Sequence, residues 1–391
     1  MNWPLNTNQF NLLDKIKISL FFLNSKNRWT QDKQVKSIEK EMAKIVGSKY
    51  SVFVSSGSTA NTLLAQYIKD FTKNFNKKNI VVFPSTTWQT SCSPWLREGF
   101  TPTFIDISLE DFCIDKAKLL SYVKKNHKKI ACIFPTSLIG FCQDMDFFIN
   151  LEKTYNIKIC FDNCENTLSS FKNKNISSYF TSTTSTYFGH QIQSVEGGFI
   201  FTNSDKEYDY FLLNRNHGMV RSISVYDRDP KPYANKDVDP LFDFYSLGNN
   251  FRNSDINAFI GRLDLKRFQK YKDIRKKLYD IFKYNLNLNK FYLPETRINQ
   301  EDVPFCFPII SKNKDLNLIN ACKDFCKKSG IEYRPIISGH LGYQTCYRNF
   351  FKEDKNYPNS IYIHKYGFYV GLNPKVRTKD ILALVKKLNN L

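Results

Sequence analysis

The amino-acid sequence predicts an α/β protein with a mostly parallel sheet, followed by a smaller α+β unit. Between about Gln31 and Thr202, short β-branched runs alternate with segments of helical length. Runs of this kind, bounded by polar turns, are typical of strands whose two faces are both covered by helices. From Asn253 to Leu288 apolar residues recur at helical spacing, which indicates one or two long helices that lead away from the sheet.

Seven runs are expected to form the strands of the large sheet: Tyr50–Val54, Ile80–Phe83, Thr103–Ile107, Ile130–Phe134, Ile157–Phe161, Tyr179–Ser182 and Gly198–Phe201. The smaller unit is expected to hold three strands and a terminal helix: Phe305–Ile310, Ile331–Ile337, Tyr366–Val370 and Lys379–Leu388. We therefore expect an N-terminal segment at 1–30, a large α/β domain at 31–250, and a long helix with a small C-terminal domain at 251–391.

The composition excludes several classes of protein. The chain has 391 residues, of which 42% are hydrophobic, as in a packed globule. Its formal net charge is +20, but the lysines are spread along the whole chain, so we expect no nucleic-acid partner. The first thirty residues lack a signal-peptide pattern, and the apolar run Ile18–Leu23 is too short to span a bilayer. We therefore expect a cytoplasmic protein with no membrane partner.

The 10 cysteines have neither the spacing of a disulfide framework nor that of a metal site. Cys322 and Cys326 are four residues apart on an expected helix, and we interpret them as core residues. Cys160 and Cys164 flank the end of an expected strand and are interpreted in the same way. No metal ion or iron-sulfur cluster is expected.

The segment Ser55–Leu64 follows an expected strand and opens a helix. The backbone N–H groups at such a helix start, here around Ser56, Gly57 and Ser58, are unpaired and lie at the positive end of the helix dipole. They form a ready site for a phosphate monoester. A plain helix cap, without a ligand, is the alternative.

Asp162 ends an apolar strand, and Trp88 follows the end of another. Ligands of open parallel sheets bind beyond the carboxyl ends of the strands, so both side chains are expected to face one site. A carboxylate there can hold a pyridinium nitrogen protonated, and an indole can stack on a planar ring. A helix-capping aspartate and a core tryptophan are the alternatives.

His190 ends a polar Ser-Thr run and stands six residues before the sharp turn Glu196-Gly197-Gly198. An imidazole at such a place is a candidate for proton transfer, although a structural histidine is the alternative. Asn250 and Arg252 precede the long helix and could reach an anion, either in the same subunit or across a dimer interface. His217 and His340 are further candidates for substrate contact.

These elements, in this order, resemble the sugar aminotransferases, a family of fold-type I pyridoxal-phosphate (PLP) enzymes, and within it the sugar 3-dehydratases. The resemblance implies a homodimer with shared active sites. It places the cofactor phosphate on the Gly57-Ser58 loop, with Ser56, and on Ser185, and brings Asn250 from the partner chain. It also implies that the following residues serve the cofactor ring: Trp88 by stacking, Asp162 at the ring nitrogen, and Glu165 as part of the pocket wall.

The resemblance gives His190 the position of the aminotransferases' Schiff-base lysine, and no lysine lies between Asn175 and Asp205. An imidazole cannot hold that linkage but can move protons. The resemblance therefore implies a lyase in which L-glutamate converts PLP to pyridoxamine phosphate (PMP). His190 then assists loss of the C3 hydroxyl from a nucleotide-linked 4-keto-6-deoxyhexose, expected to be GDP-4-keto-6-deoxy-D-mannose. Ammonia and a 4-keto-3,6-dideoxy sugar for lipopolysaccharide O-antigen are the implied products.

Besides a protein that binds the cofactor or nucleic acid without catalysis, two alternative enzyme functions remain open at this point. One is a nucleotide-sugar aminotransferase with an atypical histidine. The other is a CDP-sugar 3-dehydratase, although the clustered cysteines of the iron-sulfur type are missing around Cys306. The chain also has His190-Gln191 where the dehydratases that it resembles have two histidines.

Overall fold

The computed structural model describes residues 2–7, 9–351 and 354–391. Its centre is a seven-stranded sheet in the order β1-β9-β8-β5-β4-β2-β3. The pairs that involve β9 are antiparallel, and the four others are parallel. The strands are β1 (Tyr50–Val54), β2 (Ile80–Pro84), β3 (Thr101–Ile105), β4 (Ile130–Ile133), β5 (Lys158–Asp162), β8 (Thr181–Ser185) and β9 (Gly198–Thr202). The predicted α/β class with a mostly parallel sheet is confirmed.

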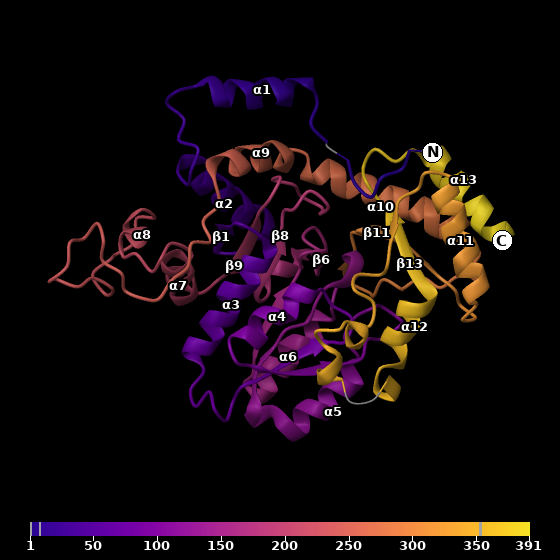
Figure 1. The fold of residues 1–391 in the computed structure, drawn as a ribbon, viewed down its shortest axis with the longest axis horizontal. Helices are drawn as coiled ribbons and strands as arrows, with labels where there is room; N and C mark the ends of the chain where they lie inside the picture. The colour runs from indigo at the N-terminus through magenta and orange to yellow at the C-terminus, as the bar shows by residue number, and fades with distance from the viewer. Residues whose placement is uncertain (1, 8, 352–353) are drawn as a thin grey trace.

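Helices cover both faces of this sheet (Figure 1). Their bounds are α2 (Lys33–Val46), α3 (Gly57–Phe71), α4 (Gln89–Arg97), α5 (Lys116–Asn126), α6 (Met145–Tyr155) and α7 (Asp205–Arg215). On one face Leu63 of α3 and Trp95 of α4 pack with Phe83 of β2. On the other face Leu119 of α5 and Phe148 of α6 pack with the sheet in a second cluster. Burial on both faces explains why the strands read as apolar runs without alternation.

A three-stranded antiparallel sheet in the order β11-β13-β12 forms the centre of the C-terminal part. Its strands are β11 (Cys306–Ile310), β12 (Tyr333–Arg334) and β13 (Gly367–Gly371). The helices of this part are α9 (Asp255–Leu265), α10 (Phe268–Asn285), α11 (Leu316–Lys328), α12 (Pro358–Tyr366) and α13 (Thr378–Asn390). The helical pattern after Asn253 is thus two helices that break between Leu265 and Phe268. The predicted α+β character is confirmed.

Three predicted strands differ from the structure. The strand expected at Ile331–Ile337 is only the two residues Tyr333–Arg334 of β12, and two others are displaced. The strand expected at Thr103–Ile107 begins two residues earlier, and the strand expected to end at Ser182 continues to Ser185. The last three residues of this second strand, β8, carry hydroxyl groups. They are buried nevertheless, because their hydroxyls form hydrogen bonds. The hydroxyl of Thr183, for example, donates to the side-chain oxygen of Asn61 over 2.6 Å. A search for apolar runs misses a strand end that is buried through polar contacts.

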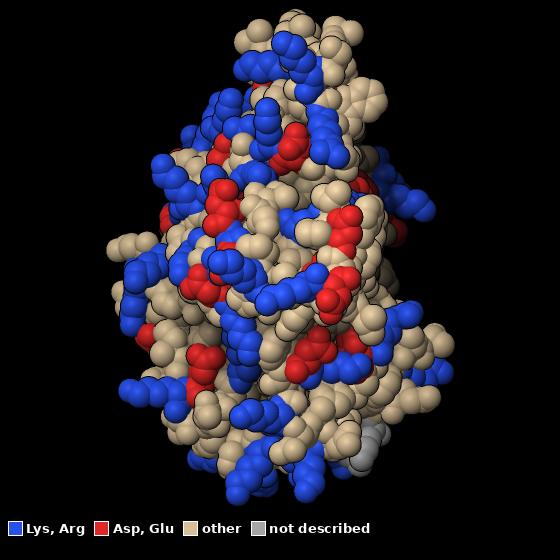
Figure 2. All heavy atoms as spheres, turned by 90° about the vertical axis from the view of Figure 1, so that its left-hand side faces the viewer, with Lys and Arg blue, Asp and Glu red and all other residues tan. Residues whose placement is uncertain are grey.

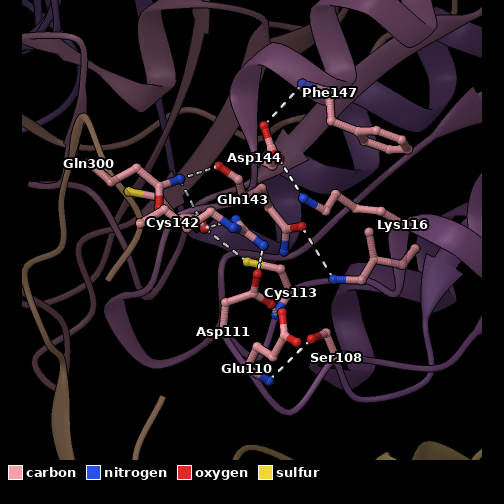
Figure 3. A network of polar contacts seen from close by, with 12 residues as sticks. Ser108, Glu110, Asp111, Cys113, Lys116, Cys142, Gln143, Asp144, Phe147 and Gln300 are labelled. Atoms are coloured by element: carbon pink, nitrogen blue, oxygen red, sulfur yellow. Dashed lines mark hydrogen bonds and ion pairs between the residues drawn. The ribbon is translucent and has the colours of Figure 1, made fainter. Parts of the chain in front are cut away.

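A second small sheet was not predicted at all: β6 (Ser170–Phe171), β7 (Lys174–Asn175) and β10 (Gln300–Glu301). Beside it, a polar network joins the segment before β11 to the loops of the large sheet (Figure 3). Gln300 donates to the carbonyl of Gln143 over 2.9 Å, and Arg297 pairs with Asp111. The side chain of Gln143 in turn donates to the Thr136 carbonyl. The network fixes the C-terminal part against the edge at which the parallel strands end.

Two segments stand away from the body in Figure 1. Helix α1 (Leu12–Leu23) lies above α9, with Phe21 stacked on Phe259 at 4.6 Å between ring centroids. The loop between α8 (Arg221–Ser224) and α9 extends beyond α7 at the left. Among the described residues, no helix is both long enough and apolar enough to cross a bilayer.

Candidate active site

A cavity of about 530 Å³ lies at the carboxyl edge of the parallel strands, between the large sheet and the C-terminal part. The cavity-lining residues include eight that the sequence singled out: Ser56, Gly57, Ser58, Trp88, Asp162, Glu165, Ser185 and His190. They come from four strand ends and one loop. The fold brings them together although the first, Ser56, and the last, His190, are 190 − 56 = 134 residues apart in the sequence. Open α/β sheets bind their ligands at this edge.

Asp162 is the carboxylate at the bottom of the cavity, and it is 2% exposed. Its Oδ2 accepts hydrogen bonds from Ser91 Oγ at 2.6 Å and from the Asn61 amide at 3.0 Å. Its Oδ1 accepts from the backbone N–H of Cys164 at 3.0 Å. Three donors directed at one buried carboxylate hold it in place. A carboxylate held in this way is the group that would suit a pyridinium nitrogen opposite it.

The start of α3 forms one wall of the cavity. Ser56 caps the helix by accepting from Thr59 N at 3.1 Å, so the next backbone N–H groups, those of Gly57 and Ser58, have no partner within the helix. A Cβ atom on Gly57 would lie 2.8 Å from the Cβ of Ser185, so only glycine permits this close approach of helix and strand. The site offers N–H groups and a serine hydroxyl, the donors that suit a phosphate.

Trp88 and Glu165 complete the side of the cavity that belongs to the large sheet. Trp88 immediately precedes α4 and is 57% exposed, so its indole face is free to cover a planar ligand. Glu165 accepts a hydrogen bond from the backbone N–H of Ile139 at 2.9 Å. Burial raises the pKa of the Glu165 carboxyl to about 7, with a smaller contribution from Asp162. Glu165 is therefore a second carboxyl group, one that changes its charge near neutral pH.

His190 lies in the loop between β8 and β9, in a turn that its backbone N–H closes on the Tyr187 carbonyl at 2.9 Å. The imidazole lies beside the Phe305 ring, 5.7 Å between centroids. Burial, with a smaller contribution from the nearby Arg275 guanidinium, lowers the pKa of His190 to about 4, although Asp162 and a hydrogen bond with the Cys164 backbone act in the opposite direction. The ring is therefore neutral at physiological pH, with its Nδ1 buried and without a hydrogen-bond partner among the described residues. A neutral imidazole can accept a proton.

Gln191 points away from the cavity. Its side-chain amide donates to the carbonyl of Val303 at 2.7 Å and accepts from the backbone N–H of Leu168 at 3.0 Å. The side chain is buried and serves the core. The loss of a second histidine at this position therefore removes no imidazole from the cavity.

Three other predicted site residues lie outside the cavity of the single chain. His217, Asn250 and Arg252 are gathered where 216–217 runs beside 249–252. Asn250 is exposed, and Arg252 donates to its side-chain oxygen at 3.0 Å. Their predicted roles stay predictions and require a second subunit that brings these residues to its own site.

His340 is not among the residues that line the cavity, and its expected contact with substrate stays a prediction. The His340 side chain is completely buried, its Nδ1 lies 2.9 Å from Ser360 Oγ, and its ring packs against Phe351 and Tyr357. Its place is explained by packing.

The sequence reasoning missed several cavity residues. The sides of the cavity that it did not foresee are formed by Leu5, Asn6, Arg275, Phe305, Glu332 and Tyr369. Burial lowers the pKa of the Arg275 guanidinium to about 10. All of them come from the N-terminal segment or the C-terminal part, which no local pattern connects to the sheet edge.

The sheet, the helix start and the buried carboxylate at its carboxyl edge define the fold class of this chain as that of the fold-type I PLP enzymes. A family model, the DegT/DnrJ/EryC1/StrS aminotransferase family, matches residues 20–389. The chain belongs to this family.

Among curated relatives, GDP-4-keto-6-deoxy-D-mannose 3-dehydratase of Yersinia pseudotuberculosis is 30% identical over 373 residues, which cover 92% of this chain and 93% of the relative. Among solved structures, the E. coli GDP-4-keto-6-deoxy-D-mannose-3-dehydratase with bound hydrated PLP matches with a TM-score of 0.89 and 27% identity over 99% of each chain. A structure of such a dehydratase with a trapped PLP-glutamate geminal diamine matches with a TM-score of 0.86 and 27% identity, over 99% of this chain and 100% of that one.

Proposed function

We propose that this chain is a PMP-dependent nucleotide-sugar 3-dehydratase. It removes the C3 hydroxyl of GDP-4-keto-6-deoxy-D-mannose, takes its amino group from L-glutamate, and releases ammonia with a 4-keto-3,6-dideoxy sugar. One observation carries the proposal: of the described residues that line the cavity none is a lysine, and His190 provides an imidazole instead. Relatives that are named for this reaction, at about the same length, support it.

The residues present fit the cofactor. Asp162, with its three donors, would hold the ring nitrogen, the α3 start and Ser185 would hold the phosphate, and Trp88 would cover the ring. When bound, the cofactor supplies a group that takes up and returns an amine and a ring that withdraws electrons from the reacting carbon. Glu165 closes the same pocket on the side of Ile139.

His190 is the general base of this proposal. With a pKa near 4 its imidazole is unprotonated at neutral pH, so it is ready to take up a proton. The protonated ring then gives that proton to the departing C3 oxygen of the sugar. Because the side chain is short and carries no primary amine, it forms no covalent bond to a cofactor aldehyde. The presence of an imidazole, and not a primary amine, at position 190 is therefore what favours dehydration over transamination in this proposal.

The test supplies the keto sugar and glutamate and measures free ammonia together with the sugar product. Release of ammonia and formation of a 3-deoxy sugar are expected. If nitrogen appears instead in the sugar and no ammonia is released, the protein is an aminotransferase, which its family membership makes the second candidate. A panel of GDP-, CDP-, UDP- and dTDP-linked 4-keto sugars decides the nucleotide; preference for the CDP sugar would overturn the GDP assignment.

We also propose a homodimer in which Asn250 reaches the cofactor phosphate of the partner subunit, with Arg252 and His217 close to the partner's substrate. The loop that precedes Asn250 and Arg252 supports this, because it extends from the body and exposes several large apolar side chains: Leu241, Phe242, Phe244, Tyr245 and Leu247. Large exposed apolar patches commonly mark protein interfaces. Lys and Arg side chains on the face that includes this region are scattered among Asp and Glu, rather than gathered in one band (Figure 2).

A further inference from the structure

The N-terminal residues Trp3 to Thr7, here called the strap, cross from the C-terminal sheet to the loop that carries His190. Trp3 anchors the strap: its indole N–H donates to the Gly371 carbonyl at 2.7 Å, and its ring packs edge-on against Phe307 at 6.0 Å. Asn373 donates to the carbonyl of Pro4 at 3.1 Å. One end of the strap is therefore fixed to the C-terminal part of the fold.

Leu5 forms part of the cavity wall. Its backbone N–H donates to Glu332 Oε2 at 3.0 Å, and both residues line the cavity. A Cβ atom on Gly371 would lie 2.2 Å from the Leu5 carbonyl oxygen, so the strap passes where only a glycine leaves room. This close fit fixes the position of the strap, and therefore of Asn6, relative to the loop that carries His190.

Asn6 makes the contact with that loop. Its side chain is 7% exposed, and its Nδ2 donates to the carbonyl of Phe188 at 2.6 Å, while its Oδ1 accepts from Thr7 N at 2.9 Å. Phe188 lies two residues before His190, inside the turn that the His190 N–H closes on Tyr187. The Asn6 amide thus holds the middle of a short turn that has no regular secondary structure.

The orientation of the imidazole depends on this turn. The His190 Nδ1 has no hydrogen-bond partner among the described residues, the ring packs against Phe305 and Tyr187, and a hydrogen bond joins it to the backbone of Cys164. That bond can form only if the backbone of residue 190 is in its place, so the turn shares in positioning the base, and a misplacement of about 1 Å costs roughly a hundredfold in rate.

We propose that Asn6 is a positioning residue that fixes the 187–190 turn, and with it the imidazole of His190, from the opposite part of the fold. The claim that Asn6 fixes the turn, here called the mechanical half, does not depend on the proposed function. The claim that it thereby positions the base, here called the catalytic half, rests on the proposed function. The strap thereby makes the placement of the base depend on contact between the C-terminal sheet and the large sheet.

Hydrogen–deuterium exchange of the free protein tests the mechanical half. In Asn6→Ala and Asn6→Asp, the peptide covering residues 186–193 should exchange at least about fivefold faster than in the wild type, while strand β5 is unchanged. Asp keeps the size of the side chain but cannot donate to the Phe188 carbonyl. Asn2→Ala is the matched control, since Asn2 is exposed and lies before the strap. Unchanged exchange in both Asn6 variants would refute the proposal.

The catalytic half is tested with the holoenzyme. Both Asn6 variants should lose about tenfold in kcat for ammonia release with KM changed less than about twofold, because the base and not the binding is disturbed. Faster exchange with unaltered kcat would show that the turn is held but that holding it does not position the base, and the positioning role falls. If the wild type itself releases no ammonia, the proposed function fails, and the exchange data alone decide whether Asn6 holds the turn.

Discussion

The amide of Asn61 donates to the carboxylate of Asp162 over 3.0 Å and accepts from Thr183 Oγ1 over 2.6 Å. Asn61 therefore connects helix α3, whose start is proposed to hold the cofactor phosphate, with the carboxylate at the end of β5 and with the neighbouring strand β8. The carboxylate proposed to face the cofactor ring is thus part of a buried network whose members restrict one another.

Removing one donor from this carboxylate should weaken cofactor binding. Ser91→Ala deletes the 2.6 Å hydrogen bond to Asp162, and hydrogen bonds to charged groups are worth about 1.5–3 kcal/mol. We expect the Kd for PLP to rise about tenfold, as measured by absorbance titration. Ser121→Ala, on the exposed face of α5, is the control. An unaltered Kd in Ser91→Ala would mean that the network does not support the ring.

Placing a primary amine at position 190 should change the chemistry. His190→Lys provides the nucleophile that an aldehyde captures, so the variant should bind PLP covalently and release no ammonia. Borohydride reduction followed by peptide mass spectrometry locates the attachment. His190→Asn, which has neither an amine nor a base, should be equally inactive but free of covalent cofactor. Full ammonia release by His190→Lys would show that His190 is not the base.

The free protein should show a pH-dependent stability that comes from Glu165. Its folded pKa is raised from 4.5 to about 7, so the folded state binds more protons than the unfolded state between these values. This contribution to stability is complete below pH 4.5 and is lost as the pH rises through 7. Glu165→Gln mimics the protonated form and should be more stable than the wild type by about 3 kcal/mol at pH 8, and equal to it at pH 4. Denaturant unfolding across this pH range measures the difference.

The matched control for this experiment is Glu110→Gln, whose carboxyl group is on an exposed residue. It should follow the wild type at every pH. If Glu165→Gln is no more stable than the wild type at pH 8, the carboxyl is not held in its neutral form by burial.

Mixed dimers test whether the active sites are shared. When His190→Ala and Asn250→Ala chains are co-expressed in equal amounts, half of the dimers should be hybrid, and each hybrid has one intact site if Asn250 serves the partner. About a quarter of the wild-type activity should return, although each variant alone is inactive. If Asn250 serves its own chain, every site in the mixture carries a lesion and no activity returns. Ultracentrifugation of the wild type provides the oligomeric state.

The sequence patterns predicted the strands that are buried through apolar side chains and placed Asp162 and Trp88 at strand ends. They failed where burial rests on polar contacts, as at Thr183–Ser185 of β8, because a hydroxyl-rich run looks like a loop. They also failed for the two-residue strands β6, β7 and β10, which carry no periodicity of their own. The division at residues 30 and 250, and the roles of the site residues, stay predictions.

What the sequence determined by itself is the local chemistry: an imidazole in place of an amine at position 190, and a small-residue helix start at Gly57. These are properties of single positions and their neighbours, so they can be read along the chain. Only the tertiary structure decided that Gln191 turns into the core, that His340 is sealed among aromatic rings, and that Asn6 meets the loop before His190. Such contacts join residues far apart in the chain, and their geometry follows from packing of the whole molecule.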